Sequence, residues 1–315
     1  MSDPEIGWIY KPYSKIFHTR EGWAVNETNS MGFNDREIVV SHDKKEVLVL
    51  GDSFTEALQV KQANNFTSLV EQTIPCVDVI NAGRSGLSPV QYDTVSKRFF
   101  KAAPISQVIV VLNYSDMHDI LSTNATIIRD QDGEIIDIEL HERQITRLRQ
   151  ALDTIFSNSA LASYLKDRVR MGMRRKTKVN TDNVKIGAEK DEIAKLKEIL
   201  NFMFTRINKR APLGVVYIPS LKYMPNREIR HDSQSALFER IIKEITEMNN
   251  IPYRSTMKQM ELSYKENSRP PVGFSNNNIA YGHLNEHGHE SVKSVLVQLI
   301  GKKCSSALML SGISH

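Results

Sequence analysis

The sequence has few cysteines, no long apolar run and little excess of charge. Only two of its 315 residues are cysteine, and Cys76 and Cys304 lie far apart without the spacing of metal ligands. A disulfide framework or a zinc site is therefore not expected, and both side chains are expected to be thiols. No stretch approaches the roughly 20 apolar residues that cross a bilayer, and the first residues do not resemble a signal peptide. As written, the chain is expected to be cytoplasmic, or periplasmic or membrane-anchored if it belongs to a longer one.

The formal net charge is +4, so composition gives no reason to expect nucleic acid or an anionic membrane as a partner. Hydrophobic residues make up 40% and charged residues 25% of the chain, which is typical of a folded globular protein. Three common enzyme signatures are also missing: the Gly-x-Ser-x-Gly elbow, the phosphate-binding P-loop and a complete dinucleotide fingerprint. The sequence therefore disfavours an α/β-hydrolase of the nucleophile-elbow kind, a P-loop nucleotide site and a dinucleotide site.

Apolar runs of strand length alternate with amphipathic helical patterns. The runs are Val47–Leu50, Val77–Ile80, Val108–Leu112 and Val215–Ile218. Helices are expected over Thr55–Ile74, Pro89–Phe100, Leu140–Leu165, Glu189–Ile207 and Asn285–Ile300. This order is typical of βαβ units, and it predicts a three-layer α/β/α sandwich around a mainly parallel, five-stranded sheet.

Three regions lie outside that alternation. Residues 1–45 are polar and rich in turns, and are expected to form an arm packed on the core domain, residues 46–301. Residues 121–210 are expected to be a mainly helical insertion with a hairpin turn at Asp132 and Gly133, and residues 302–315 a C-terminal tail. Within the insertion, the basic segment 166–178 is either a solvated face or connector, or a contact for an anionic glycan, phosphate or lipid surface.

Ser53 stands at the end of the first apolar run, in the turn VLVLGDSFTEAL. It is thus placed at the carboxyl end of a strand and near a helix N-terminus, where ligands of open α/β sheets bind. The free N–H groups at such a terminus favour a developing negative charge. The alternative is that Asp52 or Ser53 only caps the helix, because both types are preferred N-cap residues.

Three further loops are expected at the same sheet edge. They are INAGRSGLSP (residues 80–89), NYSDMHD (113–119) and YGHLNEHGHE (281–290). A serine hydroxyl needs an adjacent base and hydrogen-bond donors for the oxyanion, and these loops contain histidine, glycine and small polar residues. The four segments together favour nucleophilic catalysis by serine.

In the same order, these four blocks resemble those of the SGNH (GDSL) hydrolase family. The resemblance covers about residues 20–120 and 210–300, and the segment NSMGFNDRE (29–37) is similar to one in bacterial members associated with cell-surface polysaccharides. It implies that Ser53 is the nucleophile, that His283 is the general base, and that the backbone N–H groups of Ser53 and Gly86 belong to the oxyanion hole. Gly86 could also be required only for a positive φ.

Two positions depart from the family pattern. The family usually has Asn-Asp after the third strand, whereas this chain has Ser115-Asp116 with Asn113 two residues earlier. Ser115 is our first choice for the third oxyanion donor and Asn113 the second. The acid usually found two or three residues before the histidine is replaced by Tyr281 and Ala280. A Ser-His dyad is implied, with the imidazole oriented by a carbonyl or by an acid from elsewhere.

His287 and His289 lie close to His283 in the sequence, but the helical spacing and acid ligand of a zinc site are missing, and Asn285 is expected to cap the last helix. No metal or cofactor is expected. The hypothesis is an esterase, or an O-acyl hydrolase or transferase, that acts on an ester such as an O-acetyl group of a carbohydrate. The alternative is a catalytically weak or inactive protein of this fold that binds a glycan or acts as a scaffold.

Overall fold

The computed structural model describes residues 1–3, 5–41, 43–140 and 190–301. The chain divides into two compact units, one formed by residues 1–123 and 195–315 and the other by residues 124–194. In the described parts, no helix is both long enough and apolar enough to cross a membrane.

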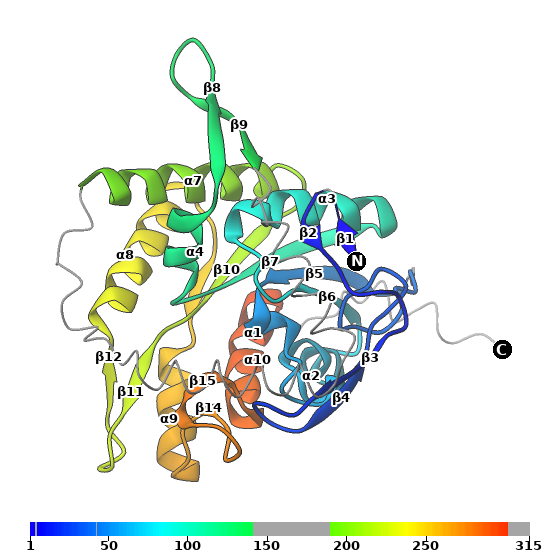
Figure 1. Ribbon diagram of the computed structural model, residues 1–315, viewed down its shortest axis with the longest axis vertical. Helices are drawn as coiled ribbons and strands as arrows, with labels where there is room; N and C mark the ends of the chain where they lie inside the picture. The colour runs from blue at the N-terminus through cyan, green and yellow to red at the C-terminus, as the bar shows by residue number, and fades with distance from the viewer. Residues whose placement is uncertain (4, 42, 141–189, 302–315) are drawn as a thin grey trace, which may run out of the picture. The chain divides into compact units, whose positions relative to one another are not determined.

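A five-stranded sheet forms the centre of the larger unit (Figure 1). Its strands are β5 (Lys45–Gly51), β6 (Val77–Gly83), β7 (Ile105–Asn113), β10 (Leu213–Ile218) and β13 (Tyr253–Ser255). They lie in the order β13-β10-β7-β5-β6, and every neighbouring pair is parallel. The predicted α/β class and parallel sheet are confirmed, and the four apolar runs form four of its strands.

Helices cover both faces of this sheet, as Figure 1 shows for α2, α9 and α10 on one side and α3 and α8 on the other. Successive residues of each strand point to opposite faces of the sheet and pack against the helices on those faces. Val47, Val49, Ile109 and Val111 pack in one core cluster with residues of α10. On the opposite face, Tyr217 of β10 contacts Phe238 of α8, with ring centroids 5.8 Å apart. Both faces are buried, which explains why these strands are continuously apolar.

The helices and remaining strands have the following bounds. The α-helices are α1 (Ser53–Glu56), α2 (Phe66–Thr73), α3 (Tyr92–Ala102), α4 (Asp116–Ser122), α7 (Lys190–Asn208), α8 (Ser233–Met248), α9 (Met257–Asn267) and α10 (Glu286–Ile300), with 3-10 turns at Gln62–Asn64 and Pro89–Gln91. The short strands are β1 (Ser2–Asp3), β2 (Gly7–Trp8), β3 (Lys15–His18), β4 (Ala24–Glu27), β8 (Ala125–Arg129), β9 (Ile135–Leu140), β11 (Leu221–Tyr223), β12 (Ile229–His231), β14 (Val272–Gly273) and β15 (Ile279–Leu284).

The single helix predicted over Thr55–Ile74 is wrong. Helix α1 ends at Ala57, which adopts the left-handed conformation at φ 57°. Helix α2 then begins after Asn65, whose side chain accepts a hydrogen bond from the backbone of Ser68. The apolar periodicity continues through this break, so it conceals two cap positions that end one helix and begin another.

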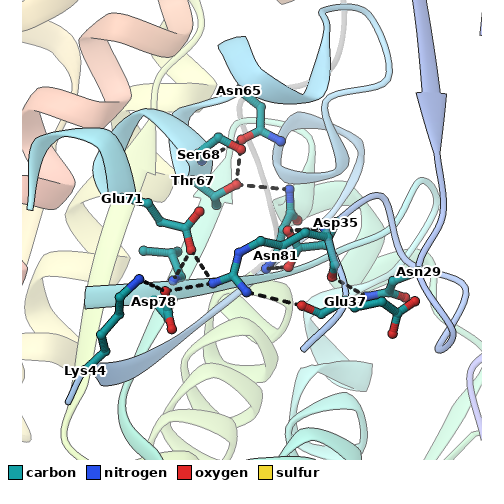
Figure 2. Close-up of polar contacts among 12 residues, drawn as sticks. Asn29, Asp35, Glu37, Lys44, Asn65, Thr67, Ser68, Glu71, Asp78 and Asn81 are labelled. Atoms are coloured by element: carbon teal, nitrogen blue, oxygen red, sulfur yellow. Dashed lines mark hydrogen bonds and ion pairs between the residues drawn. The ribbon is translucent and has the colours of Figure 1, made fainter. Parts of the chain in front are cut away.

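The N-terminal arm contacts the core through a set of polar bonds (Figure 2). Asp35 accepts a hydrogen bond from the backbone of Asn81 in β6 at 2.8 Å. Arg36 forms ion pairs with Glu71 of α2 at 2.6 Å and with Asp78 of β6 at 2.9 Å. These contacts give the NSMGFNDRE segment a structural role, because they hold the arm across the edge strand of the sheet.

The smaller unit contains the predicted hairpin, formed by β8 and β9 with its turn at Asp130–Glu134. Gly133 has φ +84° in that turn. The predicted helix over residues 140–165 and the basic segment 166–178 lie outside the described residues. Helix α7 confirms the predicted helix over 189–207.

Cys76 corrects one expectation, because it is disulfide-bonded and not a thiol. The other cysteine of the chain, Cys304, lies outside the described residues.

Candidate active site

Ser53 is the first residue of α1, and Asp52 alone separates it from the end of β5. The side chain of Asp52 caps this helix by accepting a hydrogen bond from the backbone N–H of Phe54 at 2.9 Å. Asp52 is thus the residue whose side chain caps the helix, as one alternative predicted. The hydroxyl of Ser53 contacts a different residue.

That partner is His283, which lies 230 residues later in the chain. Its Nε2 is 2.9 Å from the Oγ of Ser53. The Nδ1 of the same ring is 2.7 Å from the carboxylate of Glu21, and the other oxygen of that carboxylate accepts a hydrogen bond from the backbone N–H of His283 at 2.8 Å. An alcohol, an imidazole and a carboxylate are therefore connected in the order that serine nucleophiles require.

Glu21 belongs to the N-terminal arm, in the turn between β3 and β4, and is 9% exposed. Burial opposes ionisation of this carboxyl, but the hydrogen bonds and charge of His283 outweigh it and lower the pKa of Glu21. The Nδ1 of His18 bonds the backbone carbonyl of Glu21 at 2.9 Å, which helps to fix the turn. Sequence reasoning left room for an acid from elsewhere but did not find Glu21, because nothing in its local sequence distinguishes it from other acidic residues of the arm.

The turn that carries Gly86 begins directly after β6. The backbone N–H of Leu87 bonds the carbonyl of Arg84, and Gly86 has φ +77° at the third position of this turn. Turns with a positive φ at that position favour glycine. Among the described residues, no acceptor bonds the backbone N–H of Gly86 or of Ser53. Both groups are therefore available to a ligand.

Glu56 and Arg84 hold this turn in place. The carboxylate of Glu56 accepts hydrogen bonds from the backbone N–H of Ser85, at 3.0 Å, and from its hydroxyl. The guanidinium of Arg84 donates to the backbone carbonyls of Ile6 and Trp8 in the arm. Burial raises the pKa of Glu56 to about 7, although the bonds from Ser85 oppose the shift.

The two candidates for the third oxyanion donor are bonded to each other. The hydroxyl and backbone N–H of Ser115 both donate to the Oδ1 of Asn113, each at 2.8 Å. The Nδ2 of Asn113 donates to Asp116 at 3.2 Å. The assignment of Ser115 or Asn113 as a donor to substrate thus stays a prediction.

Asp52, Asp116 and Asp119 form a group of carboxylates behind Ser53, with their ligand oxygens within 4.8 Å of one another. Burial raises the pKa of both Asp52 and Asp116, and the charge of Asp52 raises that of Asp116 further. Burial and mutual repulsion therefore both favour the protonated forms of these carboxyls.

His287 and His289 have structural positions. Asn285 caps α10, as predicted, by accepting hydrogen bonds from the backbones of His287 and Gly288. The buried ring of His289 accepts a hydrogen bond from the backbone N–H of Phe66, and burial lowers its pKa to about 3. In the described residues, the group with the spacing of a metal site is made of Asp52, Asp116 and Asp119, and it contains neither histidine.

No family model matches the sequence, and no curated protein matches it. Several solved structures are similar in fold. A member of the lipolytic G-D-S-L family from Veillonella parvula is 12% identical with a TM-score of 0.42, over 80% of this chain and 97% of that one. The lipase/acylhydrolase from Enterococcus faecalis is 15% identical with a TM-score of 0.44, over 81% and 95%.

A catalytic mutant of an acetylxylan esterase from Geobacillus stearothermophilus is 13% identical with a TM-score of 0.45, over 84% of this chain and 97% of that one. Of these three proteins, the one from Veillonella parvula is described as a member of the lipolytic G-D-S-L family, whose sequence blocks this chain resembles. The similarity is one of fold, and no residue role is taken from these structures.

Proposed function

We propose that this protein is a serine hydrolase that acts on an ester, with Ser53 as nucleophile, His283 as general base and Glu21 as the acid that orients the histidine. The observation that supports this proposal is the continuous set of contacts from Ser53 Oγ to His283 Nε2 and from His283 Nδ1 to Glu21. In place of the dyad expected from sequence, the proposal is a triad.

In this mechanism, Nε2 of His283 takes the proton of the Ser53 hydroxyl as the oxygen attacks the ester carbonyl. Glu21 accepts the Nδ1 hydrogen bond, so that the imidazole keeps the tautomer with a free Nε2. The backbone N–H groups of Ser53 and Gly86 stabilise the oxyanion. The alcohol leaves with the proton from His283, and an acyl group remains on Ser53.

The acyl-enzyme is then resolved by water in a hydrolase or by a second hydroxyl in a transferase. We propose an O-acetyl group on a carbohydrate as the ester, from the sequence resemblance. The alternative of an inactive glycan-binding protein had three motives, namely the missing acid, the altered Asn and the basic segment 166–178. Glu21 offers a candidate for the first, so we favour the enzyme.

A fluorophosphonate probe tests the nucleophile, because it reacts only with an activated serine. We expect one adduct on Ser53 in the folded protein, and we expect Ser53→Ala to lose both the adduct and hydrolysis of p-nitrophenyl acetate. The control Ser294→Ala, on the exposed side of α10, should keep both. Labelling elsewhere with an unreactive Ser53 would contradict the proposal.

A further inference from the structure

A pocket of about 220 Å³ adjoins the chain segments that form the proposed triad. Gly22, which follows Glu21, and Asn285, two residues after His283, both line it. The remaining walls include Trp23, the loop at Gln59–Lys61 and the segment at Arg269 and Phe274–Asn276. A ligand in this pocket would therefore contact the same turn that supplies the triad acid.

The pocket combines two aromatic residues, Trp23 and Phe274, with polar groups. Trp23 is 72% exposed, although most tryptophans in folded proteins are largely covered. The side chain of Gln59, 5% exposed, has no hydrogen-bond partner in the described residues. An exposed aromatic face beside hydrogen-bonding groups suits a ring that has both C–H and hydroxyl groups. An acyl chain would require an apolar lining.

The charge of the lining favours an anion. Arg269 and Lys61 contribute two cations, and neither side chain has a hydrogen-bond or ion-pair partner in the part of the chain that the structure describes. The single lining carboxylate, Glu286, accepts a hydrogen bond from Asn64 at 3.2 Å. Unpaired cations beside a cavity attract a negatively charged ligand, and an arginine can hold a carboxylate with two parallel bonds.

The pocket wall is attached firmly to the turn that carries Glu21. The side chain of Asn276 accepts a hydrogen bond from the backbone N–H of Gly22 and donates to its carbonyl, both at 2.9 Å. It also donates to the carbonyl of Thr19 at 3.1 Å. The pocket is therefore built on the same fixed backbone as the acid.

We propose that this pocket binds an acidic sugar ring, with the ring on Trp23 and its anionic group at Arg269 and Lys61. The pocket would then be the subsite that holds a sugar unit of the glycan substrate beside the ester to be cleaved. This last step rests on the proposed function, whereas binding of the sugar does not require catalysis.

Trp23 provides a direct measurement, because the chain has only one other tryptophan, Trp8. In a Trp8→Phe, Ser53→Ala protein, Trp23 is the only tryptophan and no turnover occurs. We expect its fluorescence to change on titration with a trimer of galacturonic acid. Arg269→Ala in this background should weaken binding by about tenfold or more, the effect of losing one charge-assisted hydrogen bond. The control Arg230→Ala, at the exposed position of β12, should bind as before.

Three results would overturn the proposal. The first is no response to the acidic trimer at millimolar concentration, and the second is equally tight binding of its neutral methyl ester. The third is an equal response to sodium acetate, since it would indicate an anion site without a sugar. Labelling of Ser53 by the fluorophosphonate probe in the unmodified protein decides the proposed function separately.

Discussion

Glu21 shows how a single carboxylate can control both the position and the protonation of a histidine. One oxygen bonds the backbone N–H of His283 and the other its ring Nδ1. The first bond fixes the main chain of β15 and the second selects the tautomer. Because the pKa of Glu21 is lowered, the carboxylate remains ionised well below neutral pH.

Glu21→Gln is expected to reduce turnover of p-nitrophenyl acetate by up to about 10⁴-fold, the loss seen when the orienting acid of a triad becomes an amide. The NH2 group of a glutamine placed at Nδ1 would donate to it and favour the tautomer with its proton on Nε2, which cannot accept the proton of Ser53. The exposed Glu27→Gln, on β4, is the control. Turnover unchanged by Glu21→Gln would remove Glu21 from the mechanism.

Glu56 connects the oxyanion turn to the stability of the fold. Burial raises its pKa from 4.5 to about 7. A buried carboxyl with a raised pKa stabilises the fold below its unfolded pKa, and this contribution is lost as pH rises through the folded value. A glutamine at this position does not titrate, so the variant should not lose stability in this way. Between pH 5 and pH 8, the melting temperature of Glu56→Gln should therefore increase relative to that of the wild type.

Thermal melting of both proteins at the two pH values measures this effect. The exposed Glu266→Gln on α9 serves as the control, with a difference from wild type that should not depend on pH. If the difference for Glu56→Gln were also constant, the raised pKa of Glu56 would be wrong.

At the scale of elements, the β3–β4 hairpin places Glu21 through a glycine at its turn. Gly22 has φ +77°, and a Cβ there would lie 2.3 Å from the carbonyl oxygen of Gln59 and 2.9 Å from the ring of Phe274. The backbone of the arm thus lies directly against the core at this point. Only glycine permits both the conformation and the approach.

Gly22→Ala is therefore expected to destabilise the protein and to displace Glu21 from His283. Gly7→Ala is a matched control, since Gly7 has φ +85° but a methyl group at its Cα would meet no atom within 4 Å. In both variants the alanine must adopt the left-handed conformation, which costs about 1–2 kcal/mol of stability. Only in Gly22→Ala does the new methyl group also clash with neighbouring atoms. Urea unfolding and turnover should both show a larger loss for Gly22→Ala. Equal losses would contradict this account.

Sequence patterns were most informative for the long, buried elements. The strands β5, β6, β7 and β10 were visible as apolar runs, because both faces of a covered parallel sheet are buried. The fifth strand, β13, is the short segment Tyr253–Ser255 with one neighbouring strand, and no apolar run marks it. The break between α1 and α2 was likewise invisible, since caps interrupt a helix without interrupting its periodicity.

At the scale of the whole molecule, Cys76 is the residue for which sequence reasoning failed most clearly. Since it is disulfide-bonded, we expect it to resist alkylation in the folded, unreduced protein and to react after reduction. Reduction should also lower the melting temperature, because a disulfide restricts the unfolded chain and typically contributes about 2–4 kcal/mol. Alkylation of Cys76 without reductant would contradict the bond.

Such a bond persists in oxidising compartments and is rare where thiols are kept reduced. Resistance of Cys76 to alkylation would therefore argue against the cytoplasmic location that was expected from the sequence. The proposed triad does not depend on this outcome, because Glu21 and Ser53 each contact His283 directly within the larger unit.

The sequence by itself determined the α/β class and the order of the strands along the chain, because both follow from local apolar periods. It also predicted that Ser53 and His283 meet, although His283 lies in β15, which is not a strand of the parallel sheet. Only the tertiary structure selected Glu21 as the partner of His283, 262 residues away, and arranged the pocket at Trp23. Contacts of that kind depend on how the arm folds back over the core, and no period or local motif in a single sequence encodes them.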